Sequence, residues 1–247
     1  MTQDEYQKIL HAALEGDVES QYKMGTLHAK GELGLVNMQE SAAWFEKAGA
    51  QGHADALCNY AFLVYNGEGV EQDIQRSLDL FEKAAELGQT QAQLNLGIHY
   101  LKQDETFIDQ ALEWLKKAAA SGEAEAAYTL GVVYFEGAKV EQNYEIALNY
   151  FLQGAEVGDP ESLYSIGYLY SKGFGVEKDQ TKAVEYYKNA AEKGHASAQF
   201  NLGLHYEYGE GGLEKDAEEA IFWYQKASNQ GHQKAAEAIH LLDETDA

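Results

Sequence analysis

Small, apolar and aromatic positions recur along this chain with a period of about 36 residues. Seven glycines that each close a run of small residues lie 34 to 37 residues apart: Gly16, Gly52, Gly88, Gly122, Gly158, Gly194 and Gly231. A second ladder of small residues repeats with the same period: Gly25, Ala61, Gly97, Gly131, Gly167 and Gly203. A period of this length predicts a helical solenoid, in which stacked neighbours bury the apolar face that one repeat cannot bury alone.

Each repeat reads as two helices around a glycine-rich turn. Around the second ladder, Ser162, Ile166 and Tyr170 lie four residues apart, which places them near one face of a first helix. Turns such as NGEGV and SKGFGV follow, where glycine tolerates positive φ. Fifteen residues before most closing glycines stands a residue suited to cap the second helix: Asn37, Asp73, Asn143, Asp179 and Asp216. The closing glycine itself is predicted to end the second helix.

The glycine in the middle of each first helix costs about 1 kcal/mol against alanine by helix propensity. Its recurrence predicts that a neighbouring backbone passes too close for a side chain. Ala61 fits this interpretation, because alanine is the next smallest residue.

These patterns predict an all-α fold: a single α/α superhelical solenoid of six helix-turn-helix repeats with capping helices at both ends. The predicted repeats span 17–52, 53–88, 89–122, 123–158, 159–194 and 195–231. Residues 1–16 form the N-terminal cap, in which Thr2 and Glu5 have the spacing of a capping box. Residues 232–247 form the C-terminal cap, with a helix over 233–242 and a frayed acidic tail, DETDA.

The third repeat departs from the pattern. It lacks two residues, and LKQDETFID replaces the glycine-rich turn. Phe107 stands where the cap should be, so Asp104 or Thr106 is predicted to cap instead. We expect a tighter turn here and a local change in superhelical curvature.

The formal net charge of −23 changes what partners are expected. It repels phosphate backbones, so nucleic acid and anionic membrane surfaces are not expected as partners, and a basic protein or peptide is. The alternative is that the acidity only keeps a long surface soluble. The single cysteine, Cys58, allows no intrachain disulfide, and no signal peptide or membrane span is evident, so a cytoplasmic location is expected. A mature form cut from a longer precursor stays open.

The residue patterns predict no catalytic centre, no metal and no cofactor. His53, His195 and His232 each follow a closing glycine, which suggests decoration of a surface corner. No HExxH motif or Cys/His quartet occurs, and the glycines at 209–213 lack the Lys-Ser/Thr of a phosphate loop. Cys58 is expected to be a buried structural thiol.

The repeat resembles that of the Sel-one-like repeat family, relatives of tetratricopeptide repeats. The matching residues are Leu202-Gly203, Tyr170, Gly173-Phe174-Gly175-Val176, Asp179, Lys182-Ala183, Tyr186-Tyr187 and Ala190-Ala191. The resemblance implies a right-handed α/α superhelix with first helices lining a concave face. It also implies an adaptor or scaffold that holds other proteins, frequently in bacteria. Some secreted relatives staple each repeat with a disulfide, which this chain cannot do.

By analogy with tetratricopeptide geometry, two series of residues should project toward the concave face. The minus-three series lies three residues before each mid-helix small residue: Tyr22, Cys58, Leu94, Tyr128, Tyr164 and Phe200. The plus-one series lies one residue after it: Thr26, Phe62, Ile98, Val132, Tyr168 and Leu204. Acidic residues are expected to rim this face, namely Glu19, Asp55, Glu125 and Glu161, with Lys30 and Lys172 at the far ends. The alternative for the minus-three series is packing between adjacent first helices, and for the rim a solvated acidic face.

The favoured function is a non-enzymatic interaction module that binds a protein or peptide with a basic segment on this face. The predicted partner-binding residues are Tyr22, Phe62, Ile98, Tyr128, Val132, Tyr164, Tyr168, Phe200, Leu204, Glu125 and Glu161. A narrower hypothesis is an immunity-type inhibitor of a cationic toxin or effector. Two other hypotheses are a hydrolase that uses Cys58 or a histidine in the groove, and an architectural or self-associating spacer.

Overall fold

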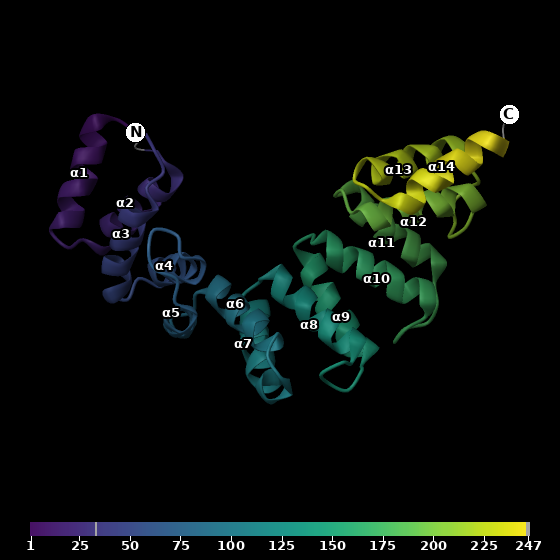
Figure 1. Ribbon diagram of the computed structural model, residues 1–247. Coiled ribbons are helices and arrows are strands. Elements are labelled where there is room, and N and C mark those ends of the chain that lie inside the picture. The colour runs from purple at the N-terminus through teal and green to yellow at the C-terminus, as the bar shows by residue number, and fades with distance from the viewer. Residues whose placement is uncertain (33, 246–247) are drawn as a thin grey trace. The chain divides into compact units, whose positions relative to one another are not determined.

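The computed structural model describes residues 1–32 and 34–245, and its chain divides into two compact units, Met1–Ser121 and Gly122–Ala247. All regular elements of the described residues are helices, which confirms the predicted fold class (Figure 1). The first unit holds α1 (Gln3–Leu14), α2 (Val18–Lys30), α3 (Met38–Ala50), α4 (Ala54–Asn66), α5 (Ile74–Glu86), α6 (Thr90–Leu101), the 3₁₀ helix η1 (Glu105–Phe107) and α7 (Ile108–Ala120).

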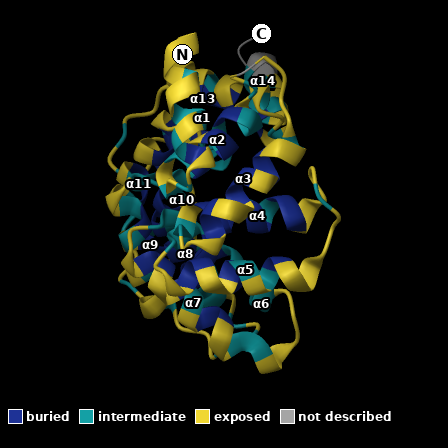
Figure 2. Cartoon of the chain, turned by 90° about the vertical axis from the view of Figure 1, so that its left-hand side faces the viewer, coloured by how far each residue is buried: buried dark blue, intermediate teal, exposed yellow. Residues whose placement is uncertain are grey.

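The second unit holds α8 (Ala124–Glu136), α9 (Tyr144–Glu156), α10 (Pro160–Lys172), α11 (Gln180–Glu192), α12 (Ala196–Tyr208), α13 (Ala217–Asn229) and α14 (Gln233–Thr245). Each repeat is one pair of these helices, from α2 with α3 to α12 with α13, as the sequence pattern predicts. Buried residues lie where helices face each other, and exposed residues lie on the outer faces and turns (Figure 2). α1 covers the first repeat of its unit and packs on Met24 and Trp44. α14 covers the last repeat of its unit and packs on Tyr224.

The predicted caps are confirmed. Thr2 and Glu5 form a reciprocal capping box at the start of α1. The five second helices with a predicted cap each begin with a side-chain oxygen that accepts the third backbone N–H: Asn37, Asp73, Asn143, Asp179 and Asp216. In the third repeat, Asp104 instead caps η1, and α7 starts at Ile108 without a side-chain cap. The tighter turn expected there is therefore this 3₁₀ turn.

The predicted reason for the mid-helix glycines is wrong in its main part, because side-chain atoms block the space most closely; at Gly97, Gly167 and Gly203 a backbone atom also lies 3.2 Å from an added Cβ. A Cβ built on Gly25 would lie 2.5 Å from Cδ1 of Phe45, and one on Gly131 would lie 2.4 Å from Cε1 of Phe151. In the five repeats with a mid-helix glycine, the blocking side chain comes from the second helix of the same repeat. The glycine thus makes room for a large residue that seals the helix pair.

The histidines that follow closing glycines are not surface decoration. Nδ1 of His53 and of His195 accepts the backbone N–H of the residue three positions on, which caps α4 and α12. Their side chains are only 11% and 8% exposed. His232 caps α14 in the same way. A histidine in this place is therefore a partly buried structural cap.

At the C-terminus, α14 extends to Thr245, so part of the predicted frayed tail is helical. Residues 246–247 of that tail lie outside the described residues.

Candidate functional site

The plus-one series lines hollows between successive first helices. Phe62 and Ile98 line one hollow of about 250 Å³ in the first unit. Val132, Tyr168 and Leu204 line two hollows in the second unit. All five side chains are partly exposed, so a partner can reach them. Thr26 lines a further recess of about 410 Å³ beside α1.

The hollow in the first unit joins α4 to α6. Phe62 packs edge-on against Phe81, with ring centroids 5.1 Å apart, and forms one wall. Ile98, His99 and Lys102 form the opposite wall on α6. The hollow therefore has aromatic side chains, Phe62 and Phe81, and one lysine, Lys102, in its lining.

In the second unit, a hollow of about 300 Å³ lies between α8 and α10. Tyr128, Val132 and Phe135 come from α8, and Tyr164 and Tyr168 come from α10. Phe135 meets Tyr168 edge-on, with ring centroids 6.1 Å apart. This hollow offers mainly aromatic surface.

A second hollow of about 530 Å³ lies between α10 and α12. It shares Tyr164 and Tyr168 with the first, so the two hollows adjoin. We call the pair the first-helix groove. The remaining lining residues of the second hollow are Ser171, Lys172, Lys178, Gln180, Tyr187, Asn201, Leu204, His205, Tyr208 and Glu210. This half is more polar than the half between α8 and α10.

The minus-three series divides between packing and exposure. Cys58 and Leu94 are 2% and 1% exposed, so neither is available to a partner. Burial raises the pKa of the Cys58 thiol to about 12, which keeps it protonated and disfavours a nucleophilic role. Tyr22, Tyr128, Tyr164 and Phe200 are partly exposed.

Three of those partly exposed rings stack on the capping histidine of the next repeat. Tyr22 stacks on His53 and Tyr164 on His195, each with ring centroids 4.4 Å apart. Phe200 stacks on His232 at 4.6 Å. One face of each ring therefore serves packing between first helices, as the alternative interpretation predicts. Tyr128 and Tyr164 nevertheless also line the groove.

The predicted acidic rim is largely engaged within the protein. Because Nδ1 of His195 accepts a backbone N–H, its Nε2 carries the proton and donates to Glu161 over 3.1 Å. Glu19 lies 3.5 Å from Nε2 of His53 in the equivalent arrangement. Asp55 accepts from the side chain of Gln89. Glu125 is exposed in the first turn of α8.

The end of the groove at α8 is acidic. Burial raises the pKa of Tyr128 first, and the nearby carboxylates of Glu161, Asp159 and Glu136 raise it further because they oppose a phenolate. Glu136 also lines the hollow. A positive group would be stabilised here.

The end of the groove at α12 contains a buried histidine. His205 is 8% exposed, and its Nδ1 has no hydrogen-bond partner among the described residues. The closest carboxylate oxygen, on Glu210, is 4.0 Å away. Burial lowers the pKa of His205, although Glu210 opposes that shift, so the imidazole is favoured in its neutral form.

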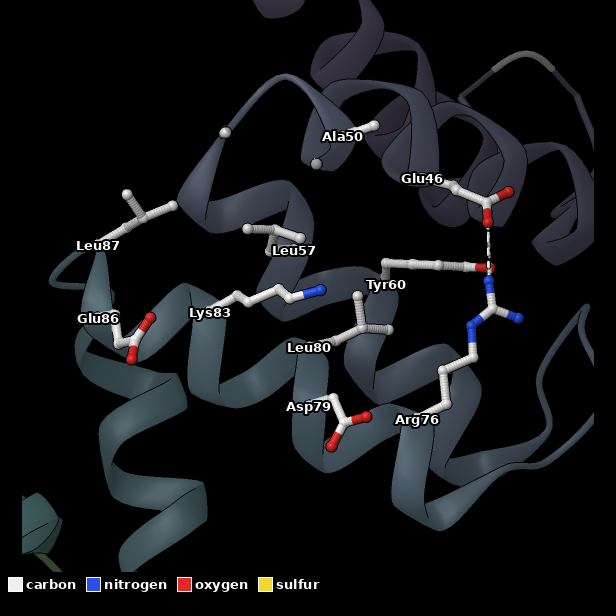
Figure 3. Close-up of a pocket in the computed structure, with 12 residues that line it drawn as sticks. Glu46, Ala50, Leu57, Tyr60, Arg76, Asp79, Leu80, Lys83, Glu86 and Leu87 are labelled. Atoms are coloured by element: carbon white, nitrogen blue, oxygen red, sulfur yellow. Dashed lines mark hydrogen bonds and ion pairs between the residues drawn. The ribbon is translucent and has the colours of Figure 1, made fainter.

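A further hollow of about 640 Å³ lies between α3 and α5, away from the plus-one residues (Figure 3). Arg76, the only arginine of the chain, donates to Glu46 and to the hydroxyl of Tyr60 over 2.8 and 2.7 Å. Lys83 lines the same hollow one turn beyond Leu80. The guanidinium is held within the protein by this network.

Apart from Lys172, sequence reasoning missed the residues that line these hollows four and five positions after the mid-helix small residue. These include Tyr65, Phe135, Ser171, Glu136 and Tyr208. They lie three and four residues after the plus-one series, which puts them on the same helical face. Extending that series by one helical turn would have found them.

Within the described residues, no group of three or more His, Cys, Asp or Glu side chains is placed to bind a metal ion. None of the helices there combines the length and apolar composition needed to cross a membrane.

The chain belongs to the Sel1 repeat family, whose repeat matches residues 18–53, 54–89, 90–123, 124–159, 160–195 and 196–232. Proteins of this family typically mediate protein–protein interactions and are generally not enzymes. The resemblance inferred from the sequence is thereby confirmed.

Solved structures agree with this assignment. A protective antigen of uropathogenic Escherichia coli that displays an SLR fold is 28% identical over 98% of this chain, with a TM-score of 0.91. This chain spans 52% of the length of that antigen. A Sel1 repeat protein from Oxalobacter formigenes is 28% identical with a TM-score of 0.73, covering 92% of this chain and 88% of its own. An immunity protein from Pseudomonas aeruginosa shares the fold at 22% identity and a TM-score of 0.52, covering 89% of this chain and 82% of its own.

Proposed function

We propose that this protein is a non-enzymatic interaction module that binds a polypeptide segment in the first-helix groove of its second unit. The observation that carries the proposal is the continuous run of partly exposed aromatic side chains across α8, α10 and α12. Aromatic side chains bury large areas at little cost in side-chain entropy, and they dominate binding energy at interfaces.

The preformed groove favours binding further. Tyr164 is fixed by His195, and Tyr168 contacts Phe135 and Phe174, so these rings lose little freedom when a partner binds. The net charge of −23 favours a partner segment with positive charge, mainly by accelerating association. The proposed location is the cytosol, where a chain with a single thiol needs no oxidising environment.

The immunity-type hypothesis is a narrower form of this proposal, and the groove by itself does not single it out. The solved immunity protein shares only the fold with this chain. The acidic net charge is what favours a cationic toxin among the conceivable partners.

The test is selection of random dodecapeptides displayed on phage against the full chain. Enriched peptides should bind Tyr168→Ala at least tenfold more weakly, since truncation of an aromatic hot-spot residue costs about 2 kcal/mol or more and tenfold is about 1.4 kcal/mol. The matched control is Phe222→Ala, which removes an aromatic ring that is 46% exposed on α13, outside the groove. Enrichment of no peptide, or equal binding to Tyr168→Ala and wild type, refutes the proposal.

A further inference from the structure

The two ends of the first-helix groove carry opposite charge at equivalent repeat positions. Glu136 lies five residues after Gly131 and lines the hollow at α8. Lys172 lies five residues after Gly167 and lines the hollow at α12. The same place on two successive first helices therefore changes from a carboxylate to an ammonium group.

One carboxylate, Glu136, lines the hollow at α8, and Asp159 and Glu161 stand at the start of α10. Glu136, Asp159 and Glu161 all oppose a negative charge on Tyr128, and no lysine or arginine is among the described residues that line this hollow. Although Glu161 interacts with His195, its side chain remains 54% exposed and can meet a cation. This end therefore favours a lysine or arginine of the partner.

The lysines at the α12 end are not neutralised by the protein. Within the part of the chain that the structure describes, neither Lys172 nor Lys178 forms an ion pair with a carboxylate. Nζ of Lys172 lies 5.8 Å from the ring centroid of Tyr168, at the boundary between the two hollows. Glu210 is the one carboxylate among the described lining residues, against two ammonium groups. An anion entering this end would thus meet an excess of positive charge.

The buried His205 is an independent indication of a polar ligand at this end. A buried polar atom is normally hydrogen-bonded, yet Nδ1 of His205 lacks a partner. The equivalent position carries Leu27, Leu63, Val133 and Leu169 in four repeats and a second histidine, His99, in the third, so packing alone does not require a histidine. His205 lines the hollow, so its imidazole can donate an N–H to an acceptor there once Nδ1, which solvent does not reach in this structure, is uncovered. Beside two lysines, a carboxylate is the acceptor that fits best.

Resting on the proposed function, we propose that the groove selects a segment with a basic residue at the α8 end, an apolar residue between, and a carboxylate at the α12 end. The two charges come from Glu136 on α8 and Lys172 on α10, which are successive first helices, and packed helices lie about 8–10 Å apart. An extended chain advances about 3.3 Å per residue. The two charges should therefore lie about three residues apart in the partner.

The test uses fluorescein-labelled dodecapeptides with one central leucine and the frames Lys-x-x-Asp, Asp-x-x-Lys, Lys-x-x-Lys and Asp-x-x-Asp. Fluorescence anisotropy at low ionic strength measures their affinity for the full chain. One mixed frame should bind at least tenfold tighter than either like-charged frame, and its order gives the direction of the bound segment. A further pair of peptides ends at the third residue after the lysine, one as the free acid and one as the amide. If the free acid binds more tightly than the amide, the groove accepts a C-terminal carboxylate as well as a side-chain carboxylate.

Charge-reversed variants locate the effect. Lys172→Glu with Lys178→Glu should shift the preference to Lys-x-x-Lys. The matched control, Lys30→Glu with Lys83→Glu, changes net charge equally but leaves the preference intact, because both lysines lie in the first unit. His205→Leu should weaken binding of the mixed frame several-fold and leave Lys-x-x-Lys unchanged.

The outcomes separate this inference from the proposed function. Equal affinity of Lys-x-x-Lys and both mixed frames for wild type, or an unchanged preference after reversal of both groove lysines, overturns the charge selection alone. Failure of every frame to bind more tightly than an uncharged scrambled peptide, together with no phage enrichment, overturns both.

Discussion

Replacing Gly167 by alanine tests whether the mid-helix glycines make room for a second-helix side chain. A Cβ at this position would lie 2.8 Å from Cδ1 and Cε1 of Tyr187 and 3.2 Å from the carbonyl oxygen of Ala183. Tyr187 is 2% exposed, and its hydroxyl donates to Ser171, so the ring has little room to move. The added methyl group is therefore a case of overpacking.

Two opposing effects set the magnitude. Alanine gains about 1 kcal/mol over glycine from helix propensity. Overpacking a closed core costs about 1–3 kcal/mol. Because backbone as well as ring lies within 3.2 Å, we expect the cost to win and Gly167→Ala to destabilise by up to about 2 kcal/mol, the difference between these two estimates.

A double-mutant cycle isolates the contact. In a Tyr187→Ala background both the ring and its γ-carbon are gone, so Gly167→Ala should be less destabilising by about 1–2 kcal/mol or become stabilising. The reverse change Ala61→Gly, in the repeat that already has alanine, should cost about 1 kcal/mol. Urea unfolding followed by far-UV circular dichroism measures each variant. A stabilising Gly167→Ala, or an equal effect with and without the Tyr187 ring, would refute the steric explanation.

Two further perturbations test the histidines. His195→Ala removes the acceptor of the Ala198 N–H and should lower stability by about 1 kcal/mol, measured by the urea midpoint; an unchanged midpoint would show that the cap contributes nothing. His205 has a lowered pKa when folded, so the unfolded chain takes up its proton first, and stability should fall as pH drops through about 6.5 and below. His205→Leu should make the urea midpoint depend less on pH between 7 and 5, and an identical pH profile would contradict the burial of a neutral imidazole.

Much of the fold was predictable from local chemistry. The side chains of Asp73 and Asn143 cap their helices by accepting the backbone N–H of the residue three positions further along the chain. These hydrogen bonds depend on neighbours in sequence alone. The plus-one series was predictable because helical periodicity places every member on one face. Its role in binding a partner stays a prediction.

The sequence by itself determined the helices, the caps, the glycine turns and the face on which Tyr168 lies, because each depends on residues within one or two helical turns. Only the tertiary structure decided that the ring of Tyr187 fills the space above Gly167, that His195 is a partly buried cap stacked on Tyr164, and that Glu136 and Lys178 lie in opposite halves of the groove. Those features join residues 20 or more positions apart. The physical reason is that steric fit and Coulomb interaction depend on distances in space, which the repeat period alone does not supply.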